Sequence, residues 1–297
     1  MFRIKNILVC TDFSSSSDLA MRSGKFLHDR VKDSSVHCLH VCELPVHWDW
    51  SMTQSLSDYF NENLELQLMK IATTRLSEQM AQENLKGETH IRLGNPFQAI
   101  NALIQEKNID LLIMGHKGKG ETPLYLGSLA TKILSSSAIP VLISKTSSSG
   151  TRVAGLIDPN KNMSEIISVT KEISKIYGCP SEIVSLFGDL AARYVGIGKL
   201  WYSTKLLSLT DDERAQVIKK IRQKIHEELG PDSKTDVKVE ISVEKKYAYH
   251  LNSILAGDHT DLVVMKRHEA GVLEKILMGS ETRRMLEVFE GNLIILP

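Results

Sequence analysis

The stretch IDLLIMGHKGKGETPLYLGSLATKIL, residues 109–134, contains a short apolar strand, a glycine-rich loop and a helix that opens at a serine. Such a strand, loop and helix form one crossover of a parallel α/β sheet. The glycines at 115 and 118 remove the Cβ atoms that would block the close approach of a ligand. The helix start offers free backbone N–H groups, and Ser128 adds a hydroxyl. The stretch therefore predicts an α/β fold with a phosphate-binding loop.

A second copy of this stretch, DLVVMKRHEAGVLEKILMGSETRRML, begins at Asp261. The glycine and serine before its helix remain as Gly279 and Ser280, but Lys266 and Glu269 replace the first two glycines. Glu269 would place a carboxylate near bound phosphate, which is repulsive at short range. We therefore expect the second site to be empty or to have another use.

The repeat extends through both halves of the chain. The apolar run at residues 7–12 ends in Asp12, and residues 153–158 form an equivalent run that ends in Asp158. Domains cluster near about 100–150 residues, so each half can form a domain with its own core. We place the domains at 1–145 and 151–297, joined by the polar linker TSSSG at 146–150.

Strand-like and helix-like segments alternate in the first half. This alternation predicts a parallel sheet with helices on both faces. We therefore expect two tandem doubly wound, five-stranded, Rossmann-like α/β domains, with a ligand crevice at the carboxyl ends of the first and fourth strands. The expected strands of the first half are residues 5–11, 35–42, 88–93, 109–114 and 139–144.

Helix starts are marked by capping residues. Ser14 to Ser17 stand before the first expected helix, and Asn95 precedes Pro96 at another. In the second half, residues 210–213 (TDDE) have capping-box spacing. An amphipathic stripe that should face the core follows this box at Val217, Ile221 and Ile225.

Charge and hydropathy exclude several classes of partner. Lys plus Arg and Asp plus Glu number 36 each, so no net charge favours nucleic acid or an anionic membrane. No apolar run approaches the ~18 residues of a membrane span. We expect a cytoplasmic protein without nucleic-acid or membrane partners.

The four cysteines show neither metal-site nor disulfide spacing. Cys38, His40 and Cys42 alternate on one face of an expected strand, which suggests a thiolate and imidazole metal site as an alternative. Successive residues on one face lie about 6.6 Å apart, however, which is too far for three ligands to converge easily. We therefore expect packing roles and assign no metal site.

Four segments of the chain resemble one family. These are ILVCTDFSSSSDLAM from Ile7, LHVCELP from Leu39, RLGNPFQAI from Arg92, and MGHKGKGETPLYLGSLATKIL from Met114, which continues to IPVLI. Together they resemble a tandem universal stress protein, in which an adenine-nucleotide-binding α/β domain occurs twice. The resemblance covers nearly the whole chain and implies a fold like that of the adenine nucleotide alpha hydrolases.

The resemblance implies a set of binding residues in the first half. Asp12 would lie by the adenosine, the backbone near Val41 would meet the adenine edge, and the glycine loop would hold ribose and phosphates. Ordinary structural roles for Asp12, Val41 and His116 remain alternatives. The loop residues implied are Gly115, His116, Gly118, Gly127, Ser128 and Leu129.

Both halves depart from the family pattern, G-x-x-G, nine residues, then G-[ST]. In the first half, the segment between Gly118 and Gly127 is one residue shorter than the pattern requires. In the second half, the corresponding segment has the required length, but the first two glycines of the pattern are replaced. We therefore expect binding of ATP or another adenine nucleotide, with or without magnesium, in the N-terminal domain alone.

Function and assembly remain as expectations. No hydrolase or P-loop motif is present, so we expect a stress-response regulator rather than an enzyme, with slow ATP hydrolysis left open. The alternatives are a nucleotide-independent interaction module, or a binder of metal or a small apolar ligand near Cys38, His40, Trp48 and Trp50. The resemblance implies pairing of the two domains within the chain as a pseudo-dimer; a homodimer of the chain and an unidentified regulatory partner are further hypotheses.

Overall fold

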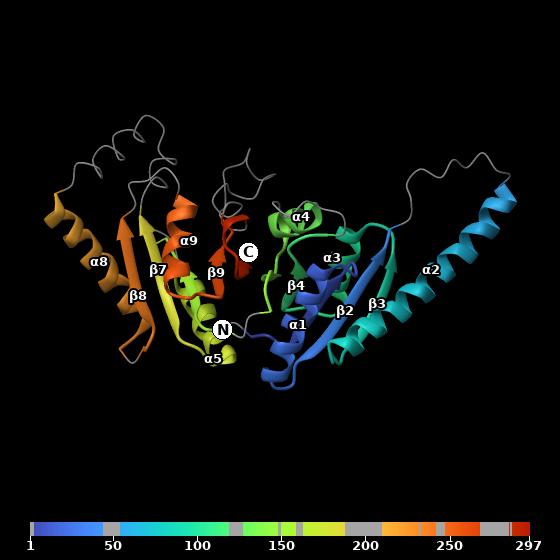
Figure 1. Ribbon diagram of the computed structural model, residues 1–297, viewed down its shortest axis with the longest axis horizontal. Helices are drawn as coiled ribbons and strands as arrows, with labels where there is room; N and C mark the ends of the chain where they lie inside the picture. Colours follow the sequence, from blue (N-terminus) through green and yellow to red (C-terminus); the bar gives the residue numbers. More distant parts are fainter. Residues whose placement is uncertain are drawn as a thin grey trace, which may run out of the picture. The chain divides into compact units, whose positions relative to one another are not determined.

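The computed structural model describes most of the 297-residue chain (Figure 1). The chain divides into two compact units, residues 3–147 and residues 148–297, and each is described by itself. The described ranges are 3–43, 54–118, 127–147, 150–158, 163–187, 210–231, 233–241, 247–267, 285 and 287–297.

The first unit is a five-stranded sheet with four helices. Neighbouring strands pair in parallel in the order β3-β2-β1-β4-β5. All five strands expected from the sequence are present, with ends shifted by a residue or two. The elements are β1 (Asn6–Thr11), α1 (Ser15–Arg30), β2 (Ser35–Cys42), α2 (Gln54–Gln82), β3 (Glu88–Leu93), α3 (Pro96–Glu106), β4 (Leu111–Gly115), α4 (Ser128–Ser136) and β5 (Val141–Ser144).

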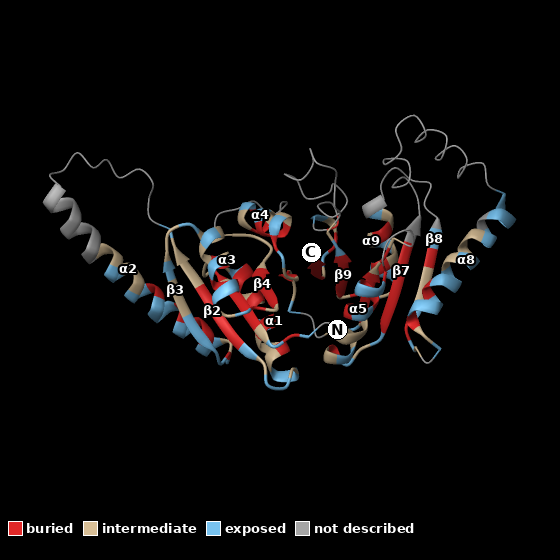
Figure 2. Cartoon of the chain, turned by 180° about the vertical axis from the view of Figure 1, so that it is seen from behind, coloured by how far each residue is buried: buried red, intermediate tan, exposed pale blue. Residues whose placement is uncertain are grey.

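The core of this unit lies around β1 and β4. Ile7, Leu8 and Val9 have no exposed surface and pair with residues 111–113 of β4. Side chains on both faces of these strands are buried, because helices cover both faces, and Figure 2 shows the central strands in red. The chain order reverses between β1 and β4, which is where a doubly wound sheet opens its ligand crevice.

The capping predictions of the first unit are confirmed. Ser14 is the N-cap of α1, and its side chain accepts a hydrogen bond from the Ser17 amide. Asn95 caps α3 by accepting from the Gln98 amide, with Pro96 in the first turn. These caps fix where α1 and α3 begin, at the carboxyl ends of β1 and β3.

The second unit repeats the strand order of the first. Its strands run β8-β7-β6-β9-β10, and the pairs described within it are parallel. The elements are β6 (Val153–Leu156), α5 (Ser164–Tyr177), β7 (Ser181–Phe187), α8 (Asp211–Leu229), β8 (Asp236–Ile241), α9 (Tyr247–Gly257), β9 (Leu262–Lys266) and β10 (Asn292–Leu296).

Helix α8 has the capping box and the amphipathic stripe that the sequence predicts. The Thr210 side chain accepts from the Glu213 amide, and the Glu213 carboxylate accepts from the Thr210 amide. Ile225 is fully buried, while Val217 and Ile221 are half-buried. The stripe therefore packs inward, most deeply toward the C-terminal half of the helix.

Several predicted features lie outside the described residues. They include Gly120, both tryptophans after β2 (Trp48 and Trp50), and Glu269, Gly279 and Ser280 of the second loop. Within the part of the chain that the structure describes, no helix is both long enough and apolar enough to cross a membrane.

Candidate functional site

A pocket of about 570 Å³ opens in the first unit where β1, β2 and β4 end. This volume lies within the range of small-molecule sites, about 300–1,000 Å³. The residues that line it come from the loops after these strands and from α2, α3 and α4. Of the eight residues predicted to bind nucleotide, seven line the pocket: Asp12, Val41, Gly115, Gly118, Gly127, Ser128 and Leu129.

Asp12 lies in the tight turn between β1 and α1. Its Oδ1 accepts a hydrogen bond from the Ser14 amide at 3.0 Å, and the Phe13 amide donates to Thr11 Oγ1 at 3.0 Å. Phe13 has a positive φ of 62°, which is uncommon for a bulky residue and requires support from its surroundings. Asp12 therefore shapes this turn while it also lines the pocket.

Phe13, His40 and Arg75 form an aromatic and cationic wall that the sequence did not reveal. The ring centroids of Phe13 and His40 lie 4.2 Å apart, and the Arg75 guanidinium lies 4.5 Å from the Phe13 centroid. His40 Nδ1 donates to the Thr11 carbonyl oxygen at 2.9 Å, which fixes its ring. Such a wall offers a planar ligand a stacking surface and an anionic ligand a positive charge.

The position of Phe13 next to Asp12 was the available signal for this wall. His40 is considered in the sequence only as part of an alternative metal or small-ligand site. Arg75 lies on α2, far along the chain, so only the packing of that helix against the sheet brings it to the pocket.

Gly115 is required by packing as well as by ligand access. A Cβ at this position would lie 2.6 Å from Ser16 Oγ and 2.7 Å from the Ser16 carbonyl oxygen. The end of β4 therefore runs directly against the first turn of α1. From the sequence, this glycine is expected to allow the close approach of a ligand. In the structure, it also allows β4 to contact Ser16 of α1.

His116 is not among the described residues that line the pocket. Its Nδ1 lies 3.0 Å from Ser16 Oγ, and its carbonyl oxygen accepts from the Gly127 amide at 3.0 Å. Burial, with smaller contributions from Lys117 and Lys145, lowers the pKa of His116 to about 4. The imidazole is therefore neutral near pH 7 and bonds the first turn of α1, while the backbone carbonyl of His116 bonds Gly127 at the other end of the glycine loop.

Helix α4 presents its N-terminal turn to the pocket. Gly127 is the N-cap and, as a glycine, has no side chain to cover the amides of the first turn. The first intrahelical bond runs from the Thr131 amide to the Gly127 carbonyl oxygen at 2.9 Å. Ser128, Leu129 and Ala130 line the pocket beyond it. The partial positive charge of this helix end favours an anionic group.

The thiols at the pocket are in their protonated form. Burial raises the pKa of Cys10 and that of Cys42. A protonated thiol is a weak nucleophile, because the thiolate is the reactive species. These two cysteines therefore act as apolar or weakly polar lining.

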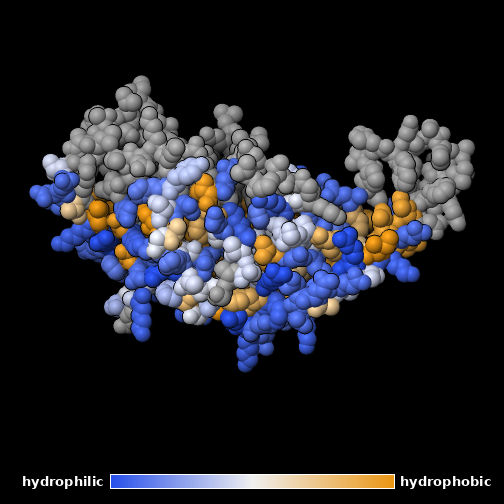
Figure 3. Space-filling model, viewed as in Figure 1, coloured by the Kyte–Doolittle hydropathy of each residue, from blue (hydrophilic) through white to orange (hydrophobic). Residues whose placement is uncertain are grey.

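Helix α2 supplies an apolar side of the pocket. Leu68, Ile71 and Ala72 line it, and Ile71 is 59 % exposed in this state. Hydrophobic side chains gather on the surface around α2 (Figure 3). An exposed apolar wall facing a pocket is typical of a surface that a ligand covers.

A buried polar network holds α2 to α1 beneath the pocket. Thr11 Oγ1 lies 2.9 Å from Ser17 Oγ and 2.8 Å from Gln79 Oε1. Gln79 Nε2 donates to Asp18 Oδ1 at 2.7 Å. Because Thr11, Ser17 and Gln79 are buried, their hydrogen bonds fix how α2 lies against the pocket floor.

The second unit differs at the end of its corresponding strand. β9 ends at Lys266, where β4 of the first unit ends at Gly115. Lys266 Nζ forms an ion pair with Glu165 Oε2 of the first turn of α5 at 2.7 Å. A charged side chain therefore occupies the position at which the first unit has its glycine.

Cys38, His40 and Cys42 of β2 do not converge as the metal-ligand set weighed from the sequence. Cys38 is buried with its Sγ 3.9 Å from Met21 Sδ, whereas His40 and Cys42 line the pocket. Cys38 is buried and Cys10, Cys42 and Cys179 are half-buried, so the packing role expected of the cysteines is clearest for Cys38.

Comparisons with known proteins support the resemblance for the first half of the chain. Residues 3–145 match the model of the universal stress protein family. Universal stress protein G of Salmonella typhimurium is 29 % identical over 132 residues, 43 % of this chain and 87 % of that protein. A universal stress protein of Methanocaldococcus jannaschii is 26 % identical over 158 residues, 49 % of this chain and 97 % of that protein.

Solved structures with a similar fold cover nearly the whole chain. One of them is a universal stress protein from Archaeoglobus fulgidus, with a TM-score of 0.67, 16 % identity, and coverage of 98 % of this chain and 97 % of that chain. At this identity the likeness concerns the fold. The match of residues 3–145 to the family model, together with these relatives, supports a universal stress protein.

Proposed function

We propose that the protein is a cytoplasmic universal stress protein whose first unit binds an adenine nucleotide and signals its presence to a regulatory partner. The observation that carries this proposal is the pocket at the ends of β1, β2 and β4. It gathers seven residues predicted from the sequence and faces the N-terminal turn of α4.

Each part of the pocket suits one part of a nucleotide. The first turn of α4 would hold phosphate oxygens through backbone N–H groups and the Ser128 hydroxyl. The adenine ring would lie near Val41 and the ring of Phe13, with Arg75 available to the phosphates. Asp12 would accept hydrogen bonds from the ribose hydroxyls. Magnesium, where present, would bind phosphate oxygens, since it prefers oxygen ligands.

Binding should be confined to the first unit. Lys266 stands where the first unit has Gly115, and its ammonium is engaged by Glu165. Glycine at this strand end allows the backbone to approach closely, which a lysine side chain prevents. We therefore propose one nucleotide per chain.

We further propose that the protein is a binding module with little or no catalysis. The described pocket residues include two protonated thiols, a carboxylate that accepts from the Ser14 amide, and an imidazole that donates to the Thr11 carbonyl. The carboxylate and the imidazole therefore bond the pocket's own backbone. Phosphate release during prolonged incubation with ATP and magnesium, at a rate above that of the protein-free control, would oppose this part of the proposal.

A small apolar ligand is the second candidate for the same pocket. Leu68, Ile71 and Ala72 form one side of it, and Ile71 is largely exposed. A fatty acid or a similar ligand would cover these side chains without using the helix N-terminus. Native mass spectrometry of the purified protein distinguishes the two by the mass of any retained ligand.

The assembly state is a further proposal, based on the resemblance alone. We propose that the two units pair within the chain as a pseudo-dimer, and that dimerisation of the whole chain is a second step. Light scattering gives the mass of the protein in solution. The mass of a monomer would rule out dimerisation of the whole chain.

Calorimetric titration with ATP, ADP and AMP, with and without magnesium, tests nucleotide binding. Ser128→Ala removes a hydroxyl from the first turn of α4 and should weaken binding, by about fivefold to tenfold for one hydrogen bond to a charged group. Ser136→Ala at the other end of the same helix is the matched control and should leave affinity unchanged. Absence of heat with every nucleotide at millimolar concentration, together with no thermal shift, would refute nucleotide binding.

A further inference from the structure

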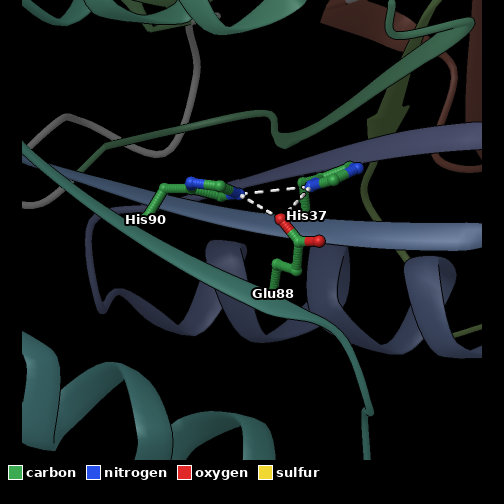
Figure 4. Close-up of side chains that lie close together, drawn as sticks. All are labelled: His37, Glu88 and His90. Atoms are coloured by element: carbon green, nitrogen blue, oxygen red, sulfur yellow. Dashed lines mark hydrogen bonds and ion pairs between the residues drawn. The ribbon is translucent and has the colours of Figure 1, made fainter. Parts of the chain in front are cut away.

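Three potential metal ligands converge on the first unit, away from the pocket. His37 of β2 and Glu88 and His90 of β3 direct their ligand atoms toward one another (Figure 4). His37 Nδ1 lies 3.2 Å from His90 Nε2 and 3.4 Å from Glu88 Oε2. His90 Nε2 lies 3.7 Å from the same carboxylate oxygen. The three atoms form a small triangle of two nitrogens and one oxygen.

The pairing of β2 with β3 creates this triangle. His37 is the register partner of Glu88, and Leu39 is the partner of His90. Residues 88 and 90 point to the same face of β3, because side chains alternate along a strand. The neighbouring strand brings His37 to that face, since adjacent strands lie about 4.8 Å apart. Three residues along one strand could not converge in this way, which was the argument against Cys38, His40 and Cys42.

The triangle has the dimensions of one face of a tetrahedral metal site. Zinc binds imidazole nitrogen and carboxylate oxygen at about 2.0–2.2 Å. Tetrahedral geometry at these distances separates neighbouring ligand atoms by about 3.3–3.6 Å. The observed 3.2, 3.4 and 3.7 Å fall close to this range without movement of the backbone. We propose that His37, Glu88 and His90 form a zinc site, with water at a fourth position.

The chemistry of the ligands favours zinc over the hard cations. Two imidazoles and one carboxylate suit zinc and other late transition metals, whereas magnesium and calcium take oxygen ligands. Neutral imidazole nitrogens and a carboxylate oxygen are among the donors that zinc takes in proteins.

Lys107 is the group that competes with the metal. Its Nζ lies 2.8 Å from Glu88 Oε2, the same oxygen that faces the two histidines. A bound cation would repel this ammonium, and Lys107 is 35 % exposed and able to turn toward solvent. His37 Nδ1 and His90 Nε2 form a hydrogen bond in which one ring donates to the other. A metal bound between the two nitrogens would replace this hydrogen bond.

The site lies near the starts of β2 and β3, whereas the nucleotide pocket lies where the strands end. The two proposals are therefore independent. A metal here would join β3 to β2 and stabilise the folded state by mass action, since the unfolded chain has no preformed site.

Competition of the full chain with a chromophoric chelator for Zn²⁺ measures the affinity. The proposal expects one Zn²⁺ per chain and a rise in the melting temperature, with weaker effects from Mg²⁺. His90→Gln and Glu88→Gln should each reduce the affinity at least about tenfold. His28→Gln is the matched control, because His28 bonds Ser34 outside the triangle, and it should bind Zn²⁺ like the wild type. Circular dichroism checks that each variant is folded.

The Lys107→Met variant distinguishes a metal site from three side chains that only form hydrogen bonds and ion pairs with one another. Removal of the competing ammonium should raise the Zn²⁺ affinity several-fold, whereas mere loss of an exposed ion pair would leave metal binding unchanged. Ser128→Ala in the nucleotide pocket should have no effect on Zn²⁺. Equal affinity in the wild type, His90→Gln and Glu88→Gln, or no Zn²⁺ binding by the folded wild type, would overturn the proposal.

Discussion

Gly115 and Ser16 are in direct contact, and this contact joins the end of β4 to the start of α1. A Cβ at residue 115 would lie 2.6 Å from Ser16 Oγ and 2.7 Å from the Ser16 carbonyl carbon and oxygen. Backbone atoms yield less readily than the end of a flexible side chain. The geometry of the pocket therefore depends on the absence of a side chain at this position.

Gly115→Ala should destabilise the first unit by about 1–3 kcal/mol, as overpacking does in a filled site. Gly257→Ala is the matched control, because an added Cβ there would have nothing within 4 Å. That control should be neutral or slightly stabilising, since alanine is the better helix former. Urea unfolding of both variants measures the difference, and equal stabilities would contradict the tight contact at Gly115.

Gln79→Ala should destabilise the protein by about 1–3 kcal/mol, because it leaves the buried Thr11 and Ser17 hydroxyls with fewer hydrogen-bond partners. Gln82→Ala, an exposed change in the last turn of the same helix, should cost much less. Thermal unfolding compares the two. If both variants melt alike, the buried network does not hold α2 in place.

The lowered pKa of His116 determines how the free energy of unfolding should change with pH. Its pKa falls from the ordinary 6.5 to about 4 in the folded protein, so the unfolded chain binds more protons between these values. The free energy of unfolding should therefore fall as the pH drops from about 6.5 toward 4. NMR titration of the imidazole should show it neutral at pH 5, and His116→Gln should lose this part of the pH dependence. Titration of the ring near pH 6.5 would refute the prediction.

The buried Glu182 of the second unit should give the opposite dependence of stability on pH. Its side chain has no exposed surface, and Oε2 has no hydrogen-bond partner among the described residues, while Arg152 lies 3.9 Å away. Burial raises the pKa of this carboxyl. The folded state therefore binds more protons above the ordinary pKa of Glu, and stability should fall as the pH rises through that window.

Glu182→Gln keeps an acceptor for Thr260 and removes the charge. It should raise the melting temperature at pH 7 by about 2–4 °C and flatten the decline with pH. A lower melting temperature at pH 7 would show that Glu182 is ionised and stabilised by Arg152.

Much of the fold could be predicted because its signals are local. Apolar runs located all five strands of the first unit, and Ser14, Asn95 and Thr210 located helix starts through their own side chains. The carboxyl ends of β1 and β4 lie together in any doubly wound sheet, so Asp12 and Gly115 could be placed at one pocket.

The features that could not be predicted from the sequence depend on packing between segments that are distant along the chain. Arg75 reaches the pocket because α2 crosses the sheet at one particular angle, which no local pattern records. The triangle of His37, Glu88 and His90 requires the register between β2 and β3. The contact of Gly115 with Ser16 likewise requires the position of α1 to within an ångström or so.

The stoichiometry of nucleotide binding tests the central claim most directly. Native mass spectrometry of the full chain, incubated with ATP and magnesium, counts the nucleotides bound to each chain. The pocket of residues 3–147, together with Lys266 in the second unit, predicts one nucleotide per chain and a lower occupancy in Ser128→Ala than in Ser136→Ala. No bound nucleotide, or two per chain with equal affinity, would contradict the account.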